Sequence, residues 1–398
     1  MDSMIPYGKQ DINQDDIDAV LEVLTSDFLT QGPKVALFES SIAEYCKAEF
    51  GVAVNSATSA LHLANLALGV GVNDIVWTSP ITFVATANSA LYCGAAIDFV
   101  DIDLASGNMC MDALEKKLIL AKQNNCLPKV VIPVHLAGQS CDMSTIHALA
   151  KQYHFNVIED ASHAIGASYQ GKPIGHSKYS DITVFSFHPV KIITSAEGGL
   201  AVTNNKNLAK IMYQLRSHGI VTDQESMTEK SHGPWYYQQL NLGFNYRMTE
   251  LQAALGISQV KRLDEFINKR NTLAKVYDQA FESSSLTCLT PYSDAYSSYH
   301  LYIVLLAERH KDFHQSIISR LRENNIFAHV HYIPIHLQPY YQNLGHKQGD
   351  YPIAENYYQR AISLPLYPNL SSEQQQYIIN TLLLDLEELD NKATLTGK

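Results

Sequence analysis

The stretch DITVFSFHPVKIITSAEGGLAVTNN, residues 181–205, holds a single lysine, Lys191, between two apolar runs. The runs at 182–187 and 200–203 are rich in β-branched and aromatic residues, so we predict two strands, with a turn at EGG, residues 197–199. A lysine held away from water has a lowered pKa, and its neutral amine is a nucleophile suited to imine chemistry. The alternative is a loop lysine that points into solvent, and other parts of the chain have to decide between the two.

Segments on both sides of this stretch alternate between predicted strands and predicted helices. Strands are expected at 51–54, 74–79, 96–101, 129–134 and 156–159, and helices at 11–25, 34–48, 61–68, 82–93, 111–125, 144–153 and 204–218. This alternation indicates an α/β fold with a mostly parallel sheet covered on both faces. Ligands bind such sheets beyond the carboxyl ends of the strands. Polar segments at 55–59, 160–163 and 186–191 follow strands there, and we expect them to converge.

The segment NSATSA, residues 55–60, lies between a predicted strand and a predicted helix. Its small residues leave backbone N–H groups exposed at the positive end of the helix, an arrangement that binds phosphate. An ordinary capping loop is the alternative. No G-x-G-x-x-G follows a strand, which disfavours a nicotinamide dinucleotide site.

Asp160 lies at the end of a predicted buried strand, where an unpaired carboxylate is costly. A pyridinium nitrogen would remove that cost, and a helix N-cap is the alternative. His163 is either a second ligand on the same helical turn or a core histidine bonded to backbone. Ser186, five residues before Lys191, either donates to a phosphate or simply ends a strand. Together with the phosphate cradle, these residues make up the set that pyridoxal phosphate requires.

The chain has 398 residues, which is long for one domain, so we predict two. We assign residues 1–270, with an N-terminal segment that contacts substrate, to a large domain, and 271–398 to a smaller C-terminal α/β domain. A helix capped by Thr249 is expected from Glu250 to about Phe281. Strands are expected at 299–306 and 328–332, and helices at 311–324, 353–361 and 371–389. The segment 220–240 is too long for a plain connector, so we expect it to be mobile or part of a site.

The composition excludes several classes of protein. A formal net charge of −11 opposes binding to nucleic acid or to anionic membranes. The six cysteines are scattered without a C-x-x-C pair, which favours a reducing compartment. The histidines 329, 331 and 336 lack the spacing of a metal site, and we expect no metal. No run approaches a membrane span and the first residues lack the apolar core of a signal peptide, so we expect a cytoplasmic protein.

The motifs, taken in order, resemble those of the DegT-type family of nucleotide-sugar aminotransferases, which are fold-type I pyridoxal phosphate enzymes. They are NSATSA at 55–60, TFVAT at 82–86, EDASHAIG at 159–166, SFHPVK at 186–191, EGG at 197–199 and GFNYRM at 243–248. They span most of the chain. Within the family the likeness is closer to members that make UDP-4-amino-4,6-dideoxy-N-acetyl-β-L-altrosamine for pseudaminic acid. That closer likeness rests on IPY at 5–7, SDFLTQG at 26–32 and VHYIPI at 330–335.

The resemblance implies a role for each matching residue. Lys191 would hold pyridoxal 5′-phosphate as a Schiff base and move a proton, while Asp160 would bind the ring nitrogen. The other cofactor-binding residues would be Ala57, Thr58, Phe83, His163, Ser186 and, from the neighbouring subunit of a homodimer, Asn245. The sugar-nucleotide pocket would be lined by Tyr7, Asp27, Phe28, Leu29, Thr30, His329, Val330, His331 and Tyr332. Arg247 would bind an anionic group of the donor or the sugar nucleotide, or form a structural ion pair.

The implied reaction is a transamination in two halves. L-Glutamate would give its amino group to the cofactor, which would then aminate C4 of a UDP-linked 4-keto-6-deoxy-N-acetylhexosamine. The sequence leaves the sugar open, so another UDP- or dTDP-linked 4-keto-6-deoxy sugar is an alternative. A pyridoxamine-dependent sugar dehydratase would lack the lysine. A non-catalytic sugar-nucleotide-binding protein would have lost part of the cofactor set, none of which is missing.

Overall fold

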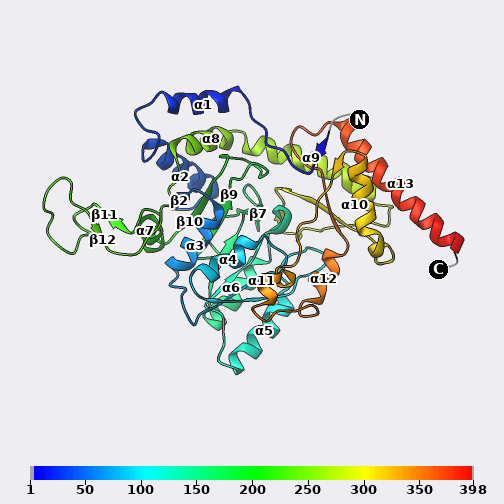
Figure 1. The fold of residues 1–398 in the computed structure, drawn as a ribbon, viewed down its shortest axis with the longest axis horizontal. Coiled ribbons are helices and arrows are strands. Elements are labelled where there is room, and N and C mark those ends of the chain that lie inside the picture. Colours follow the sequence, from blue (N-terminus) through cyan, green and yellow to red (C-terminus); the bar gives the residue numbers. More distant parts are fainter. Residues whose placement is uncertain (1–3, 397–398) are drawn as a thin grey trace.

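The computed structural model describes residues 4–396 and is built around a seven-stranded sheet (Figure 1). The strand order is β2 (Phe50–Val54), β10 (Gly199–Thr203), β9 (Ile182–Ser186), β6 (Asn156–Asp160), β5 (Val130–Ile132), β3 (Ile75–Thr78) and β4 (Ala96–Phe99). All neighbours are parallel except β10, which runs antiparallel to both β2 and β9. The predicted α/β fold with a mostly parallel sheet is confirmed. The ends of the two predicted domains, residues 1–3 and 397–398, lie outside the described residues.

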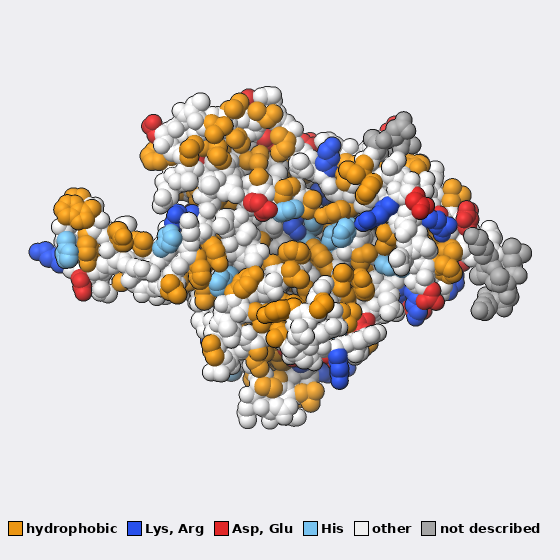
Figure 2. All heavy atoms as spheres, in the orientation of Figure 1, with side chains coloured by type: hydrophobic (Ala, Val, Ile, Leu, Met, Phe, Trp, Pro, Cys, Tyr) orange, Lys and Arg blue, Asp and Glu red, His pale blue; other side chains and the backbone are white. Residues whose placement is uncertain are grey.

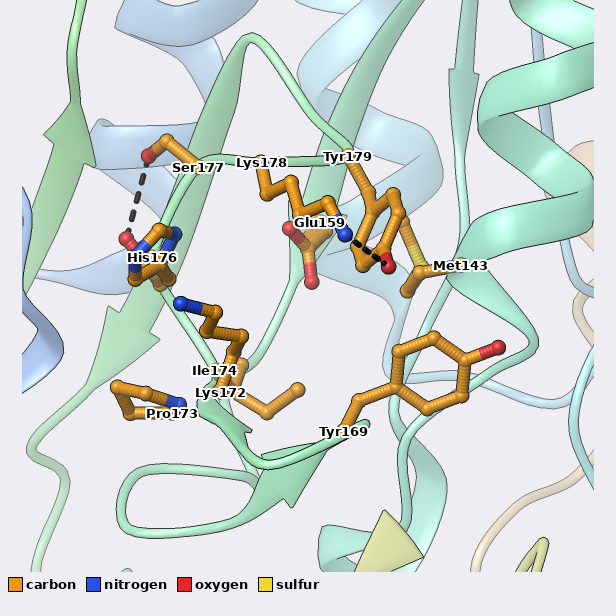
Figure 3. Close-up of a pocket in the computed structure, with 11 residues that line it drawn as sticks. Met143, Glu159, Tyr169, Lys172, Pro173, Ile174, His176, Ser177, Lys178 and Tyr179 are labelled. Atoms are coloured by element: carbon orange, nitrogen blue, oxygen red, sulfur yellow. Dashed lines mark hydrogen bonds between the residues drawn. The ribbon is translucent and has the colours of Figure 1, made fainter. Parts of the chain in front are cut away.

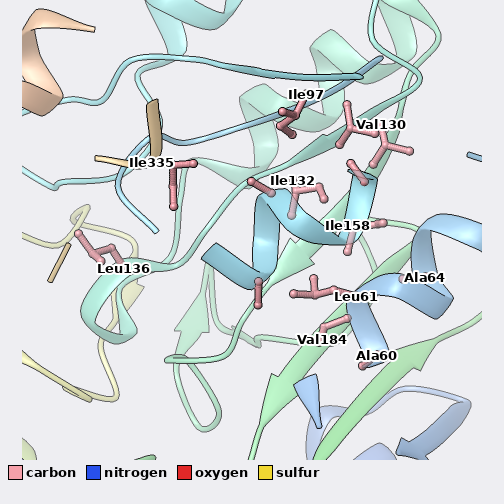
Figure 4. Close-up of a cluster of buried hydrophobic side chains, with 14 of the residues drawn as sticks. Ala60, Leu61, Ala64, Ile97, Val130, Ile132, Leu136, Ile158, Val184 and Ile335 are labelled. Atoms are coloured by element: carbon pink, nitrogen blue, oxygen red, sulfur yellow. The ribbon is translucent and has the colours of Figure 1, made fainter. Parts of the chain in front are cut away.

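Helices cover both faces of the sheet because successive side chains of a strand point in opposite directions. One face carries α3 (Ala57–Ala67), α4 (Val84–Tyr92) and α7 (Lys206–Leu215). The other carries α2 (Pro33–Cys46), α5 (Met111–Gln123) and α6 (Met143–Tyr153). Figure 4 shows Leu61 and Ala64 of α3 beside Ile158 and Val184 of the sheet. Such two-sided burial makes the strands almost entirely apolar and leaves their carboxyl ends for polar residues.

The predicted helix from Glu250 to Phe281 is in fact two helices, α8 (Glu250–Val260) and α9 (Leu263–Phe281). Arg262 at the break leaves helical geometry, with φ −107° and ψ 6°. Its guanidinium donates to Asp11 at 2.9 Å and to Asp16 at 2.6 Å. Asp16 lies in the first turn of α1 (Gln14–Leu24), whose N-cap is Asn13. These ion pairs with the N-terminal segment favour the break, and the 3.6-residue periodicity of the sequence does not reveal it.

Helix α9 takes part in two buried clusters. Its first half packs with Leu263, Phe266 and Ile267 below the main sheet. Its second half packs with Ala274, Tyr277 and Phe281 against the C-terminal region. We propose that the domain boundary lies between these halves, at residue 270.

The C-terminal region contains a sheet of β13 (Thr287–Cys288), β15 (Tyr302–Leu305) and β17 (Ala361–Leu364). Its helices are α10 (His314–Glu323), α11 (Pro339–Gln342), α12 (Pro352–Tyr358) and α13 (Ser372–Thr396). A small sheet of β14 (Ala295–Tyr296), β7 (Ser168–Tyr169) and β8 (Lys172–Pro173) joins the two regions. The N-terminal strand β1 (Ile5–Pro6) pairs in parallel with β16 (Ile326–Phe327). Ile5 is therefore buried in the core of the C-terminal region.

The predicted strand at 328–332 is wrong. Strand β16 ends at Phe327, and only His329 pairs beyond it, through two backbone hydrogen bonds with Ser363. The next backbone N–H, that of Val330, donates to the His329 imidazole at 2.8 Å instead of to a neighbouring strand. Satisfaction of this donor by a side chain removes the need for a ladder partner.

Residues 220–240 form a two-stranded ribbon of β11 (Ile220–Val221) and β12 (Gln238–Gln239), which projects from the body of the molecule in Figure 1. Figure 2 shows hydrophobic side chains gathered towards its tip. Trp235 on the ribbon is 76% exposed and Leu242 just after it is 83% exposed. In the part of the chain that the structure describes, no helix is long and apolar enough to cross a bilayer.

Candidate active site

A cavity of about 940 Å³ opens at the carboxyl ends of the central strands. It brings together eleven of the residues predicted from the sequence: Tyr7, Ala57, Thr58, Phe83, Asp160, His163, Ser186, Lys191, His329, His331 and Tyr332. They come from both ends of the chain and from four strand ends of the main sheet or the turns that follow them. The predicted convergence of the three polar segments is confirmed.

The floor of the cavity contains the beginning of helix α3. Ser56 caps this helix by accepting a hydrogen bond from the Ser59 N–H at 3.2 Å. Ala57 and Thr58 are the first helical residues, so their N–H groups have no partner within the helix. A side chain at Gly199 would place its Cβ 2.4 Å from the Ala57 nitrogen. Glycine at this position therefore lets strand β10 run directly against the helix end.

Lys191 follows strand β9 in a tight turn, with its N–H donating to the His188 carbonyl at 2.9 Å. It lines the cavity. Burial lowers the pKa of Lys191 to about 8, and the negative charge of Asp160 opposes part of that shift. A lysine in this setting is partly neutral near neutral pH and can act as a nucleophile or a proton carrier.

Asp160 ends strand β6 and is only 5% exposed. Its Oδ1 accepts from the Ser162 N–H at 3.1 Å and hydroxyl at 2.6 Å. Its Oδ2 accepts from the Thr86 hydroxyl at 2.6 Å. No helix begins between Asp160 and β7, so among the described residues its carboxylate is fixed by hydroxyls rather than used as a helix cap. A sequence signal for Thr86 exists: Thr82 and Thr86 are one helical turn apart and share a face at the start of α4.

Glu159, the residue before Asp160, points to the opposite face of the sheet. Figure 3 shows it beside a separate small cavity of about 20 Å³. Its carboxylate accepts from His135 Nε2 at 2.7 Å, from Thr183 at 3.1 Å and from Ser180. Burial raises the pKa of Glu159, but these hydrogen bonds outweigh that effect and leave it lowered. Glu159 therefore remains charged while sealed inside the protein.

His163 is 5% exposed and both of its ring nitrogens are bonded. Nδ1 accepts from the Ala137 N–H at 3.3 Å, and Nε2 lies 3.0 Å from the Tyr332 hydroxyl oxygen. Burial, followed by the charges of Lys191 and His331, holds the pKa of His163 well below its ordinary value. The ring is therefore neutral. His163 is bonded to the backbone, which is one of the two expectations for it, and it also lines the cavity.

Aromatic rings form part of the cavity wall. Tyr7 lies with its ring centroid 5.4 Å from that of His329 and 5.0 Å from that of His331. Phe83 is 58% exposed, and its ring centroid lies 6.3 Å from that of Tyr332. A large apolar ring with this exposure can cover a flat ligand.

Seven predicted residues do not line the cavity of this chain: Asp27, Phe28, Leu29, Thr30, Asn245, Arg247 and Val330. The segment 27–30 is exposed, and Thr30 pairs with Thr249 through a single β-bridge. Arg247 donates to the Ser217 hydroxyl at 3.0 Å. The cavity instead includes residues that the sequence did not single out, among them His188, Glu197 and Gln252. Of these, Glu197 had a signal, because it belongs to the EGG turn.

Comparison with known proteins supports these observations. Residues 10–383 match the model of the DegT/DnrJ/EryC1/StrS aminotransferase family. The UDP-4-amino-4,6-dideoxy-N-acetyl-β-L-altrosamine transaminase of Campylobacter jejuni is 38% identical over 97% of this chain and 98% of its own. The spore coat polysaccharide biosynthesis protein SpsC of Bacillus subtilis is also 38% identical, over 95% and 96% of the two chains.

Solved structures of sugar aminotransferases are also similar to this chain over nearly its whole length. Helicobacter pylori PseC, an aminotransferase of pseudaminic acid biosynthesis, has a TM-score of 0.88 and 34% identity over 97% of this chain and all of its own. A sugar aminotransferase of Streptococcus pneumoniae in a PLP-form has a TM-score of 0.87 and 30% identity over 97% and 99% of the two chains. The chain belongs to the DegT/DnrJ/EryC1/StrS family and is a sugar aminotransferase that uses pyridoxal 5′-phosphate.

Proposed function

We propose that this enzyme transfers the amino group of L-glutamate to C4 of a UDP-linked 4-keto-6-deoxy-N-acetylhexosamine. The product would be UDP-4-amino-4,6-dideoxy-N-acetyl-β-L-altrosamine, which serves pseudaminic acid biosynthesis. The observation that carries the proposal is the cavity with Lys191, of lowered pKa, and Asp160 on its wall. Full-length similarity to relatives named for this product supports the choice of sugar.

The residues of the cavity fit pyridoxal phosphate. The first N–H groups of α3, at Ala57 and Thr58, and the Ser186 hydroxyl would hold the phosphate. Glycine at 199 leaves the space that this approach needs. Phe83 would cover the ring, and the Asp160 carboxylate would bind the ring nitrogen as its counter-charge. When bound, the cofactor supplies an aldehyde carbon that takes up the amino group and a ring that delocalises electrons.

Lys191 would hold and move the proton of the reaction at its Nζ. A pKa of about 8 lets the amine accept a proton and return it near neutral pH. Asp160 stays in place because Thr86 and Ser162 fix both of its oxygens. His163, whose two ring nitrogens are bonded within the chain, would form part of the wall on the same side of the cavity.

Tyr7, His329, His331 and Tyr332 would bind the sugar nucleotide, because they form the wall contributed by the two ends of the chain. The seven predicted residues outside the cavity need another explanation. We propose a homodimer in which Asn245, Arg247, Val330 and the segment 27–30 serve a shared or neighbouring site. The exposure of Asn245 and of residues 27–30 supports this arrangement. A cytoplasmic location is also proposed, supported by six free cysteines.

The deciding experiment incubates the purified enzyme with L-glutamate and a panel of UDP- and dTDP-linked keto-sugars. We expect C4 amination of the altrosamine precursor with ping-pong kinetics. Amination of a different sugar in the panel would assign the enzyme to another biosynthetic pathway. A protein that stays colourless with pyridoxal phosphate would contradict catalysis and favour a binding protein.

Two further measurements test the residue assignments. Borohydride reduction should trap the cofactor on Lys191, and the Lys191→Ala variant should trap none. Retention of the adduct in that variant would assign the role to another lysine. Sedimentation that shows only monomer at working concentration would remove the proposed role of Asn245.

A further inference from the structure

The loop after strand β5 has two residues in the left-handed region, Ala137 at φ +61° and Gly138 at φ +94°. A non-glycine residue keeps such a conformation only where its surroundings enforce it. The C-terminal region supplies that constraint. Gly138 O accepts from the Ser298 N–H and the Ser297 hydroxyl, each at 3.1 Å, and the Ser298 hydroxyl donates to the His163 carbonyl at 3.1 Å. The loop, residues 297–298 and His163 therefore form one interlocked unit.

A buried arginine holds the other side of this unit. Arg270 is 1% exposed and its Nη1 donates to the carbonyls of Tyr299 and His300, each at 3.2 Å. The His300 ring consequently packs against His163, with ring centroids 4.4 Å apart. His163 can neither turn nor flip without displacing this packing.

The result of the constraint is a fixed tautomer. The Ala137 N–H donates to His163 Nδ1, so that nitrogen carries no proton. We assign the remaining ring proton of the neutral imidazole to Nε2. Nε2–H must then donate to the Tyr332 oxygen, 3.0 Å away. The reverse bond, from the tyrosine to the histidine, is excluded because Nε2 has no free lone pair.

We infer that Tyr332 is an oriented hydrogen-bond donor of the active site, with its direction set by His163 as a positioning residue. Because one lone pair of the Tyr332 oxygen accepts from His163, the hydroxyl proton turns towards the cavity that Tyr332 lines. Burial raises the pKa of Tyr332, so this hydroxyl keeps its proton at all physiological pH values. The Tyr332 hydroxyl can therefore donate a hydrogen bond to a ligand, but it carries no negative charge.

The matching ligand group is an oxygen acceptor. Within the proposed function, on which this inference rests, two oxygens qualify: the one on the pyridine ring of the cofactor and a carbonyl or hydroxyl oxygen of the sugar. The family resemblance implies that His163 itself binds the cofactor. The structure commits His163 Nε2 to Tyr332, so the donor that reaches the cavity is the tyrosine.

The first test measures the tautomer directly and does not depend on the reaction. The protein as purified is labelled with ¹⁵N-histidine, and the His163 signals are identified by their loss in His163→Gln. We expect a protonated Nε2 and an unprotonated Nδ1. A protonated Nδ1 would overturn the inference whatever the substrate proves to be.

The second test replaces the hydroxyl. Tyr332→Phe should weaken one of two interactions by about tenfold, the effect of one lost hydrogen bond. A shifted visible absorption maximum with weaker pyridoxal phosphate binding would assign the acceptor to the cofactor. An unchanged spectrum with a raised KM or lowered kcat for the keto-sugar would assign it to the sugar. No change in either readout would overturn the inference.

Tyr277→Phe is the matched control, because Tyr277 is a fully buried tyrosine whose hydroxyl donates to the Pro365 carbonyl outside the cavity. It should change neither the spectrum nor the kinetics. If wild-type enzyme binds pyridoxal phosphate but aminates no keto-sugar, the proposed function fails while the spectral comparison remains valid.

The third test separates positioning from structural support. His163→Gln can place an amide N–H where Nε2–H lies, whereas the shorter Asn cannot. We expect His163→Asn to reproduce the defect of Tyr332→Phe and His163→Gln to recover part of it in both the spectrum and the kinetics. If His163→Gln and His163→Asn both fold and have the same spectrum and kinetics, the inference is overturned. If His163→Asn does not fold, the tautomer measurement still decides.

Discussion

Two histidines bonded to the same loop have the same local arrangement and different surroundings. His135 accepts at Nδ1 from the Cys141 N–H at 3.1 Å, and His163 accepts at Nδ1 from the Ala137 N–H. Burial lowers the pKa of His135, but hydrogen bonds and charges of Cys141 and Glu159 outweigh burial and raise the pKa to about 10. Against that shift, Nδ1 accepts from the Cys141 N–H and so carries no proton, and on this geometry we take the ring as neutral. His135 then donates to Glu159 on the sealed side of β6. His163 donates to Tyr332 on the open side.

The difference lies in what completes each site. On the sealed side, Glu159 finds all its donors within the chain: His135, Ser180 and Thr183. On the open side, Asp160 and Tyr332 face a cavity that a ligand fills. One hydrogen-bonding pattern thus supports stability on one face of the sheet and directs chemistry on the other. Variants on the two sides should therefore affect different quantities.

The largest effect is expected on the open side. Asp160→Asn keeps the size of the side chain and the two bonds that Oδ1 accepts from Ser162, while its amide NH2 would donate to the Thr86 hydroxyl instead of accepting from it. The substitution removes the counter-charge for the ring nitrogen. We expect kcat/KM to fall roughly a thousandfold, with the free energy of unfolding nearly unchanged. Steady-state kinetics and urea unfolding measure the two quantities. A large loss of stability in this variant would show that the two sides are not functionally distinct.

Glu159→Gln is the matched change on the sealed side. It removes a charge that accepts three hydrogen bonds, so we expect the free energy of unfolding to fall by about 2 kcal/mol. The kcat of the folded enzyme should stay within about threefold of wild type. A much larger fall in kcat, at a temperature where the variant is folded, would assign Glu159 to catalysis.

Although the reaction needs Lys191, this lysine should lower the free energy of unfolding of the cofactor-free protein. Its charged form is disfavoured by burial, so Lys191→Met should stabilise the cofactor-free protein at pH 7 by about 1–3 kcal/mol. The folded pKa of about 8 lies below the unfolded value, so the difference should shrink as pH rises from 8 towards 10.5. A difference that does not change with pH would mean that Lys191 is not desolvated.

The smallest effect is expected for protein stability at acidic pH. The folded-state pKa of Glu159 is lowered, so its contribution is present above the unfolded pKa and is lost as pH falls through the folded one. The stability difference between wild type and Glu159→Gln should be constant above pH 6 and shrink as pH falls below 4.5. Urea unfolding across this range gives the difference. A constant difference down to pH 3 would contradict the assigned role of the sealed carboxylate.

The sequence reveals the sites that depend on local pattern. Lys191, Asp160 and the start of α3 were predicted because strand alternation and small residues determine them within a few positions. Other features of the structure depend on pairings between residues that are distant in sequence. The break at Arg262 depends on Asp11 and Asp16, and the irregular chain at His329 depends on Ser363. The Ala137 contact of His163 needs a left-handed turn that residues 297–298 impose, and no local pattern reports it.

The pairing of β1 with β16 sets an order of events during synthesis. Ile5 and Ile326 are about 320 residues apart, and the wall that includes Tyr7 exists only once both are present. At 5–20 residues per second, the ribosome needs roughly 15–60 s to make the second partner after the first. During that interval the apolar Ile5 has no core to enter. The nascent chain would therefore carry its cofactor-binding half well before it can recognise a sugar.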